Sequence, residues 1–112
     1  MKIIETTISL KEIWDTRETT FEEMLKIVVD IDQEIIAVDA EMHADLEHLL
    51  LEEGSVQQNL WGANIFPLRQ PLERLEYTSF INIRPTMGNR SMEVLDPLIR
   101  TRIESIVAKL LI

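Results

Sequence analysis

Residues 84–91, Arg-Pro-Thr-Met-Gly-Asn-Arg-Ser, form a polar segment in which two arginines flank the only Gly-Asn pair of the 112-residue chain. Gly88 and Asn89 belong to the residue types that most readily adopt positive φ, and Pro85 biases Arg84 toward an extended backbone. The pattern predicts a tight loop in which guanidinium groups and free amides converge. Such a loop can bind an external carboxylate or phosphate, and it can equally pair with the protein's own acids.

Under the first interpretation, the ligand-binding residues are Arg84, Asn89 and Arg90. We add Gln57, which lies in a second polar segment, Ser-Val-Gln-Gln-Asn at residues 55–59, because amides orient ligands as well as close turns. The spacing is not that of a phosphate-binding P-loop, which requires Gly-Lys-Ser/Thr at a helix start. No nucleotide-binding motif is present, and the ligand expected here is a small anion.

The only two histidines of the chain fall within residues 41–48, Glu-Met-His-Ala-Asp-Leu-Glu-His. On a helix, His43 lies one turn from Glu47, but an imidazole and a carboxylate alone do not make a metal site, so no metal and no cofactor are expected. His43 or Asp45 would be the base if the protein were an enzyme. No Gly-x-Ser-x-Gly motif indicates a serine nucleophile.

The charge is unevenly distributed along the sequence. The net charge is -9, with 15 acidic and 4 basic residues in residues 1–58 but 5 acidic and 7 basic residues in residues 59–112. The acidic first half disfavours binding of nucleic acid, and either solvated acidic faces or a complementary contact between subunits would explain the asymmetry. The absence of cysteine, of a leader and of an apolar run long enough for a bilayer predicts a cytoplasmic protein without membrane contact.

The remaining pattern predicts one α+β domain over residues 1–112, with the element order β-α-β-β-α-β-β-α. About five strands would form a mostly antiparallel sheet with about three helices on one face. The expected strands cover residues 2–8, 25–31, 34–38, 61–66 and 76–83, and the expected helices begin after Ser9, span residues 44–53 and begin at Asp96, with a further helical turn at residues 21–24.

Local signals support several of these elements. Ser9 and Asp96 are N-cap residues, and Gly54 is expected to end the middle helix in a left-handed conformation. Strands 25–31 and 34–38 are predicted to form a hairpin in which Ile27 faces Val38 and Val29 faces Ile36.

Several segments together resemble a family of small prokaryotic proteins described only as a domain of unknown function. They are His-Ala-Asp at residues 43–45, Leu-Leu-Leu-Glu-Glu-Gly-Ser at 49–55, Leu-Trp-Gly at 60–62, and Asn-Ile-Arg-Pro with Gly-Asn-Arg-Ser at 82–91. The likeness spans roughly residues 25–112 and implies no reaction, ligand or partner.

We therefore expect a small cytoplasmic binding protein that uses the arginine loop for an anionic ligand or partner. A homodimer is expected from the apolar residues 110–112 and from an uncovered sheet edge. The alternative is a small hydrolase with a composite cleft of His43, Asp45, Arg84 and Arg90, which requires strand 61–66 to run antiparallel to strand 34–38. A third possibility is a regulatory protein or one half of a toxin-antitoxin pair.

Overall fold

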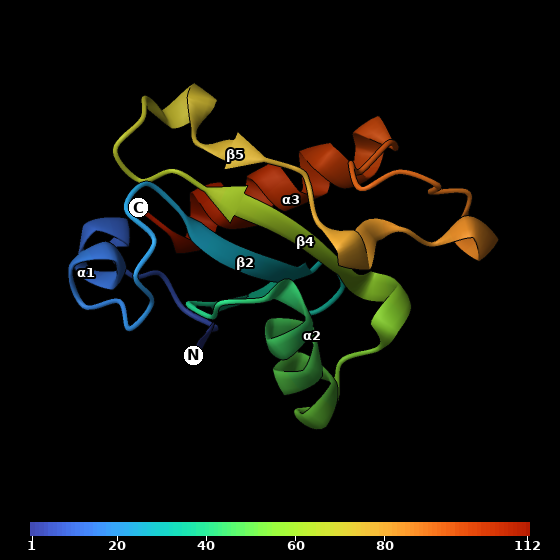
Figure 1. The fold of residues 1–112 in the computed structure, drawn as a ribbon, viewed down its shortest axis with the longest axis horizontal. Coiled ribbons are helices and arrows are strands. Elements are labelled where there is room, and N and C mark those ends of the chain that lie inside the picture. The colour runs from blue at the N-terminus through green and yellow to red at the C-terminus, as the bar shows by residue number, and fades with distance from the viewer.

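A computed structural model describes all residues of the chain and contains one sheet, with helices around it (Figure 1). The sheet has five strands. The strands lie in the order β1-β3-β2-β4-β5, and every neighbouring pair is antiparallel. The strands are β1 (Lys2–Ile4), β2 (Leu25–Asp30), β3 (Ile35–Val38), β4 (Leu60–Ile65) and β5 (Leu75–Glu76). The helices are α1 (Leu10–Asp15), α2 (His43–Glu52) and α3 (Pro97–Leu110). The predicted α+β class and antiparallel sheet are confirmed.

The predicted hairpin register between β2 and β3 is also confirmed. Ile27 pairs with Val38 and Val29 with Ile36. The connection is a four-residue turn, residues 31–34, in which Glu34 adopts a φ of 56°. Because this turn adds one residue to each side of the central pair, the register is the same as for a two-residue turn.

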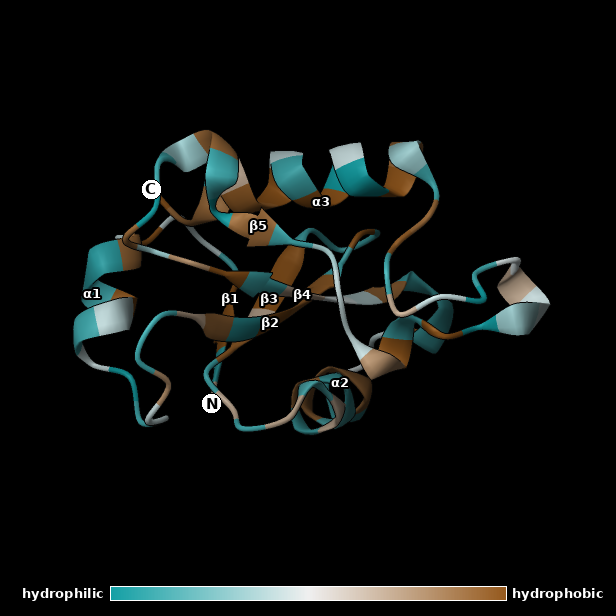
Figure 2. Ribbon diagram, turned by 45° about the horizontal axis from the view of Figure 1, so that its top comes forward, coloured by the Kyte–Doolittle hydropathy of each residue, from teal (hydrophilic) through white to brown (hydrophobic).

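The two faces of the sheet are covered by different helices, so the expectation that all helices share one face is wrong. Figure 2 shows α3 on one side of the sheet and α2 on the other. A cluster of 18 buried apolar residues includes the inner sides of α1 and α3 and one face of the sheet. A smaller cluster of 6 buried residues joins α2 to the opposite face. Because helices cover both faces of the sheet, a central strand has no solvent-facing side and needs no alternating polar residues. This explains the continuous apolar run Ile27-Val28-Val29, which is fully buried.

The helix ends follow the local signals in the sequence. The Ser9 hydroxyl accepts a hydrogen bond from the backbone of Glu12, and the Asp96 carboxylate accepts one from the backbone of Leu98. Gly54 has a φ of 101° and follows the last residues of α2. Its N–H and that of Ser55 donate to carbonyls in the last turn of the helix, as in a Schellman motif.

Three of the expected segments are shorter or absent. Residues 21–24 are not helical, and the first strand stops at Ile4. Of the expected strand over residues 76–83, only Glu76 belongs to a strand, β5, and Ser79 caps a single 3-10 turn at residues 80–82 that replaces the rest.

The C-terminal residues pack against the start of the chain. The N–H of Ile8 donates to the carbonyl of Leu110, and that of Ile112 donates back to Ile8. Leu110 and Leu111 are buried within the protein, and Ile112 remains exposed. Most of the apolar terminus on which the dimer prediction relied is therefore used inside one chain. No helix combines the length and the apolar character needed to span a bilayer.

Candidate functional site

The arginine loop is attached to the sheet by Asn82. The side chain of Asn82 accepts a hydrogen bond from the N–H of Gly62 at 2.9 Å and donates to the Gly62 carbonyl at 3.0 Å. The same amide nitrogen also donates to the carbonyl of Met92 at 3.0 Å. A Cβ on Gly62 would lie 2.5 Å from the Cβ of Ser79, so only glycine allows the segment before the loop to approach β4 this closely.

Asn89 holds the loop together from inside. Its amide nitrogen lies within hydrogen-bond distance of the carbonyls of Asn82, Ser91 and Glu93, and its side-chain oxygen accepts from the N–H of Leu95. The side chain is buried, and its polar groups are occupied by the protein's own backbone. Its predicted contact with a ligand stays untested, and its position makes it a residue that orders the loop.

The loop itself is a short hairpin between Arg84 and Asn89. The backbone N–H of each residue donates to the carbonyl of the other, at 2.6 Å and 3.1 Å. Gly88 has a φ of 76°, which meets the expectation of a left-handed residue at this point. The tight turn leaves the two predicted arginines in different environments.

The Arg84 side chain turns inward and is 10% exposed. One terminal nitrogen donates to the Glu47 carboxylate of α2 at 3.1 Å, and the guanidinium carbon lies 4.9 Å from the centroid of the Trp61 ring. The other terminal nitrogen, Nη1, is buried without a hydrogen-bond partner. Burial lowers the pKa of Arg84, while the charge of Glu47 opposes that shift.

Arg84 lines an open hollow of about 460 Å³ between the loop and the residues that precede β4. The lining consists of two glutamines, Gln57 and Gln58, and the loop residues Ile83, Arg84, Pro85, Thr86 and Met87. Gln57 and Arg84 thus line the same hollow, and their binding of a ligand stays a prediction. Arg90 does not line the hollow; it is exposed and makes no ion pair.

His43 and Asp45 are not brought together. The His43 Nε2 lies 2.8 Å from the carbonyl of Ala63 and therefore carries the hydrogen of that bond, whereas Asp45 is exposed on another side of α2. Burial lowers the pKa of His43, and the nearby charge of Lys26 acts in the same direction. This histidine is a buried neutral group.

The topology also opposes a composite hydrolase cleft. Strands β3 and β4 are both antiparallel to β2 and so run parallel to each other. None of the four main hollows is lined by His43, Asp45 or Arg90. Of the two arginines, only Arg84 forms an ion pair with α2, through Glu47.

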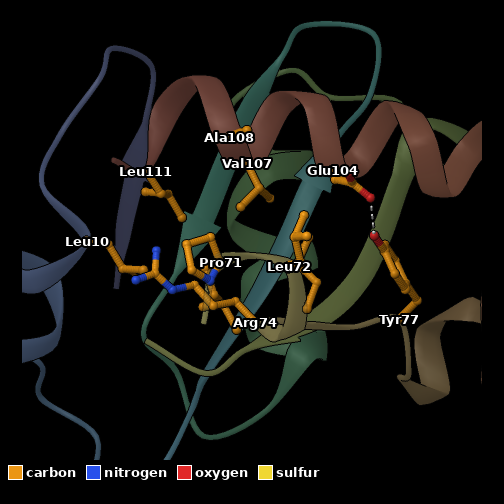
Figure 3. A pocket seen from close by; sticks show the side chains of 11 residues that line it. Leu10, Pro71, Leu72, Arg74, Tyr77, Glu104, Val107, Ala108 and Leu111 are labelled. Carbon is orange, nitrogen blue, oxygen red and sulfur yellow. Dashed lines mark hydrogen bonds between the residues drawn. The ribbon is translucent and has the colours of Figure 1, made fainter. Parts of the chain in front are cut away.

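A second concave surface lies between α3 and residues 71–77. Its volume is about 440 Å³, and eight of its eleven lining residues are hydrophobic. Figure 3 shows α3 side chains along one wall and the side chains of residues 71–77 along the other. The three polar residues are Arg74, Tyr77 and Glu104, and the Tyr77 hydroxyl donates to Glu104 at 3.4 Å. Burial, with the Glu104 charge as a second cause, raises the pKa of Tyr77.

Comparison with family profiles gives a match over residues 2–110, to the family described as "Protein of unknown function (DUF5674)". The chain belongs to the DUF5674 family. The match confirms the resemblance to a domain of unknown function, and it extends over the first residues as well as the rest. No curated protein and no solved structure matches the chain.

Sequence reasoning on this DUF5674 chain missed the apolar groove and the role of Asn82. The groove combines residues from β4, the segment after it and α3, which no local pattern joins. A signal for the Asn82 contact is present in the sequence, because Gly62 interrupts an apolar strand and an isolated strand glycine marks a close approach. No group of three or more histidines and acids lies close enough to hold a metal ion.

Proposed function

We propose that the protein is a binding protein whose hollow beside Arg84 takes a ligand with a carboxylate group. The observation that carries the proposal is the state of the Arg84 guanidinium, which is nine-tenths buried and makes a single hydrogen bond. Leaving buried N–H groups unpaired is unfavourable, more so on a charged group. A ligand that supplies an acceptor oxygen would remove this cost.

The chemistry around Arg84 favours a carboxylate over a phosphate. Glu47 already compensates most of the guanidinium charge, so the site offers hydrogen-bond donors more than it offers net positive charge. The first 58 residues carry a large excess of acids, which repels multiply charged anions and nucleic acid. The exposed amides of Gln57 and Gln58 supply further donors and acceptors at the rim.

The Nη1 atom is buried, so a ligand oxygen reaches it only when a neighbouring side chain moves. Ile83 and Met87 stand at this rim and are partly exposed. An apolar rim beside an amide and a guanidinium suits a ligand whose carboxylate is attached to an apolar group.

The proposal includes a homodimer in the cytoplasm. Exposed apolar side chains near the groove support the dimer, and the lack of cysteine suits a reducing compartment. The arrangement does not favour the hydrolase alternative, because His43 is buried against a backbone carbonyl and Asp45 is exposed elsewhere on α2. No contact in the structure favours the regulatory or toxin-antitoxin alternative.

A thermal-shift and calorimetric titration with acetate, succinate, benzoate and inorganic phosphate tests the binding site. A carboxylate at about 100 times its Kd adds about 2.7 kcal/mol to the free energy of unfolding, which raises the Tm by several degrees. We expect the shift in the wild type and in Arg90→Ala, a smaller shift in Gln57→Ala, and none in Arg84→Gln.

Arg90→Ala and Gln57→Ala are the informative variants, because both residues are exposed and their replacement leaves the fold intact. A shift that Arg90→Ala removes would place the site on the outer side of the loop. The absence of any shift or heat with the wild type would reject the proposed ligand class.

A further inference from the structure

The groove between α3 and residues 71–77 has an unusually exposed leucine at its border. Leu72 is 96% exposed and contributes to the wall of a concave apolar surface of about 440 Å³. Scattered exposed leucines are normal on protein surfaces, but a protruding leucine next to an apolar groove forms a knob and a hole on one face. Figure 3 shows Leu72 among the side chains that surround the groove, on the wall opposite α3.

The groove also contains two charged residues, Arg74 and Glu104, that are available to a second subunit. Arg74 makes no ion pair in a chain with 20 acids, and Glu104 makes none either. They stand on opposite walls, Arg74 beside Leu72 and Glu104 on α3. In a two-fold contact, residue i of one subunit meets residue j of the other and the reverse, so an unpaired cation and an unpaired anion on one face are self-complementary.

We infer that this groove is the contact surface between two copies of the chain. Leu72 of each copy enters the groove of the other, and Arg74 of each copy pairs with Glu104 of the other. Ten of the eleven lining residues come from the half of the sequence that holds 5 acids and 7 bases, the exception being Leu10. This face therefore brings two acidic proteins together where their like charges repel least.

The neighbouring surface extends the apolar area. A second hollow of about 390 Å³ shares Leu10 and Arg74 with the groove and includes the exposed side chains of Leu68 and Ile112. The contact thus has an apolar centre with charged groups beside it, as protein interfaces commonly have.

This inference rests on the homodimer of the proposed function but not on its ligand site. The mass of the assembly tests the groove, whereas carboxylate binding tests the hollow beside Arg84. A monomer that still binds carboxylate, or a dimer that does not, would separate the two ideas.

The experiment is sedimentation equilibrium and light scattering of the full chain over micromolar concentrations. We expect a wild-type dimer, a monomer for Leu72→Asp, and a dimer for the control Leu98→Asp, which changes another exposed leucine outside the groove. Because Leu72 makes almost no buried contact within the chain, Leu72→Asp keeps the circular dichroism spectrum of the wild type.

A charge exchange tests the pairing directly. Arg74→Glu and Glu104→Arg each weaken the dimer by about tenfold in Kd or more, since two pairs are lost per dimer. The combined variant restores the affinity, because the charges again oppose each other across the two-fold axis. A monomeric wild type at every concentration, or a dimer that Leu72→Asp leaves unchanged, overturns the inference, and so does a combined variant no tighter than the single ones.

Discussion

Replacing Gly62 with alanine tests whether close packing at β4 holds the arginine loop in place. The added Cβ would lie 2.5 Å from the Cβ and 2.7 Å from the Oγ of Ser79, and 3.1 Å from Cγ1 of Ile81. Carbon atoms attract each other at about 3.5 to 4.0 Å, so the 2.5 Å contact is strongly repulsive and the segment carrying Ser79 must move.

The expected loss of stability combines three terms. Overpacking of a buried site costs about 1 to 3 kcal/mol. Movement of the segment also weakens the two hydrogen bonds between Asn82 and Gly62, at about 1 kcal/mol each. Alanine recovers about 0.4 to 1 kcal/mol by restricting the unfolded chain. We expect Gly62→Ala to be about 2 kcal/mol less stable, which corresponds to a Tm lower by about 8 °C.

Urea and thermal denaturation measure this difference, and a second substitution at Ser79 shows its cause. Ser79→Gly removes both of the atoms that the new Cβ would meet most closely. The double variant should therefore be more stable than the sum of the single effects by about 1 kcal/mol or more. A Gly62→Ala protein as stable as the wild type would refute the reasoning, and strict additivity with Ser79→Gly would show that the cost does not come from this contact.

Three further predictions concern the loop and α2. Asn89→Ala leaves several buried backbone groups without partners and should lower the free energy of unfolding by about 2 to 4 kcal/mol in urea denaturation; a change below about 0.5 kcal/mol would contradict the bonding described for it. Because burial lowers the pKa of His43, the unfolded chain binds its proton first, so stability is full above the unfolded pKa of about 6.5 and falls as the pH drops below it. Urea titrations of His43→Gln should lack that part of the pH dependence, and an identical profile in both proteins would exclude a buried neutral histidine. Arg84→Ala leaves Glu47 without its partner and should lower the free energy of unfolding by about 2 kcal/mol. Arg90 is exposed, so Arg90→Ala should change that free energy by less than about 0.5 kcal/mol. Equal effects of the two variants in thermal melts would mean that the ion pair of Arg84 does not stabilise the fold.

The parts of the fold predicted correctly are those in which the signal is local. The polar turn between two short apolar runs determines the register of the β2–β3 hairpin, and Asp96 followed by proline determines where α3 begins. These patterns work because a few neighbouring residues contain the whole physical cause. The position of α2 on the far face depends instead on strands that are buried on both sides, which a single sequence presents as one uninterrupted apolar run.

The candidate site could be predicted only in part, for a related reason. Polar residues in a loop look alike in sequence whether they face solvent or the backbone. Asn89 and Arg84 both proved inward, one bonded to its own loop and the other to Glu47, which is 37 residues away. The apolar groove depends on residues from separate parts of the chain, Leu10, residues 65–77 and residues 104–111, and only the folded arrangement brings them together.

The contact between Asn82 and Gly62 has a consequence for how far the sheet can grow. β5 pairs with only Asn64 and Ile65 of β4, so Gly62 lies beyond the end of β5. At that point the carboxamide of Asn82 satisfies both backbone groups of Gly62, as an added strand would, but presents no new row of donors and acceptors to a further strand. A single side chain thereby covers the part of β4 that β5 leaves open, where free backbone groups would invite strand addition and aggregation.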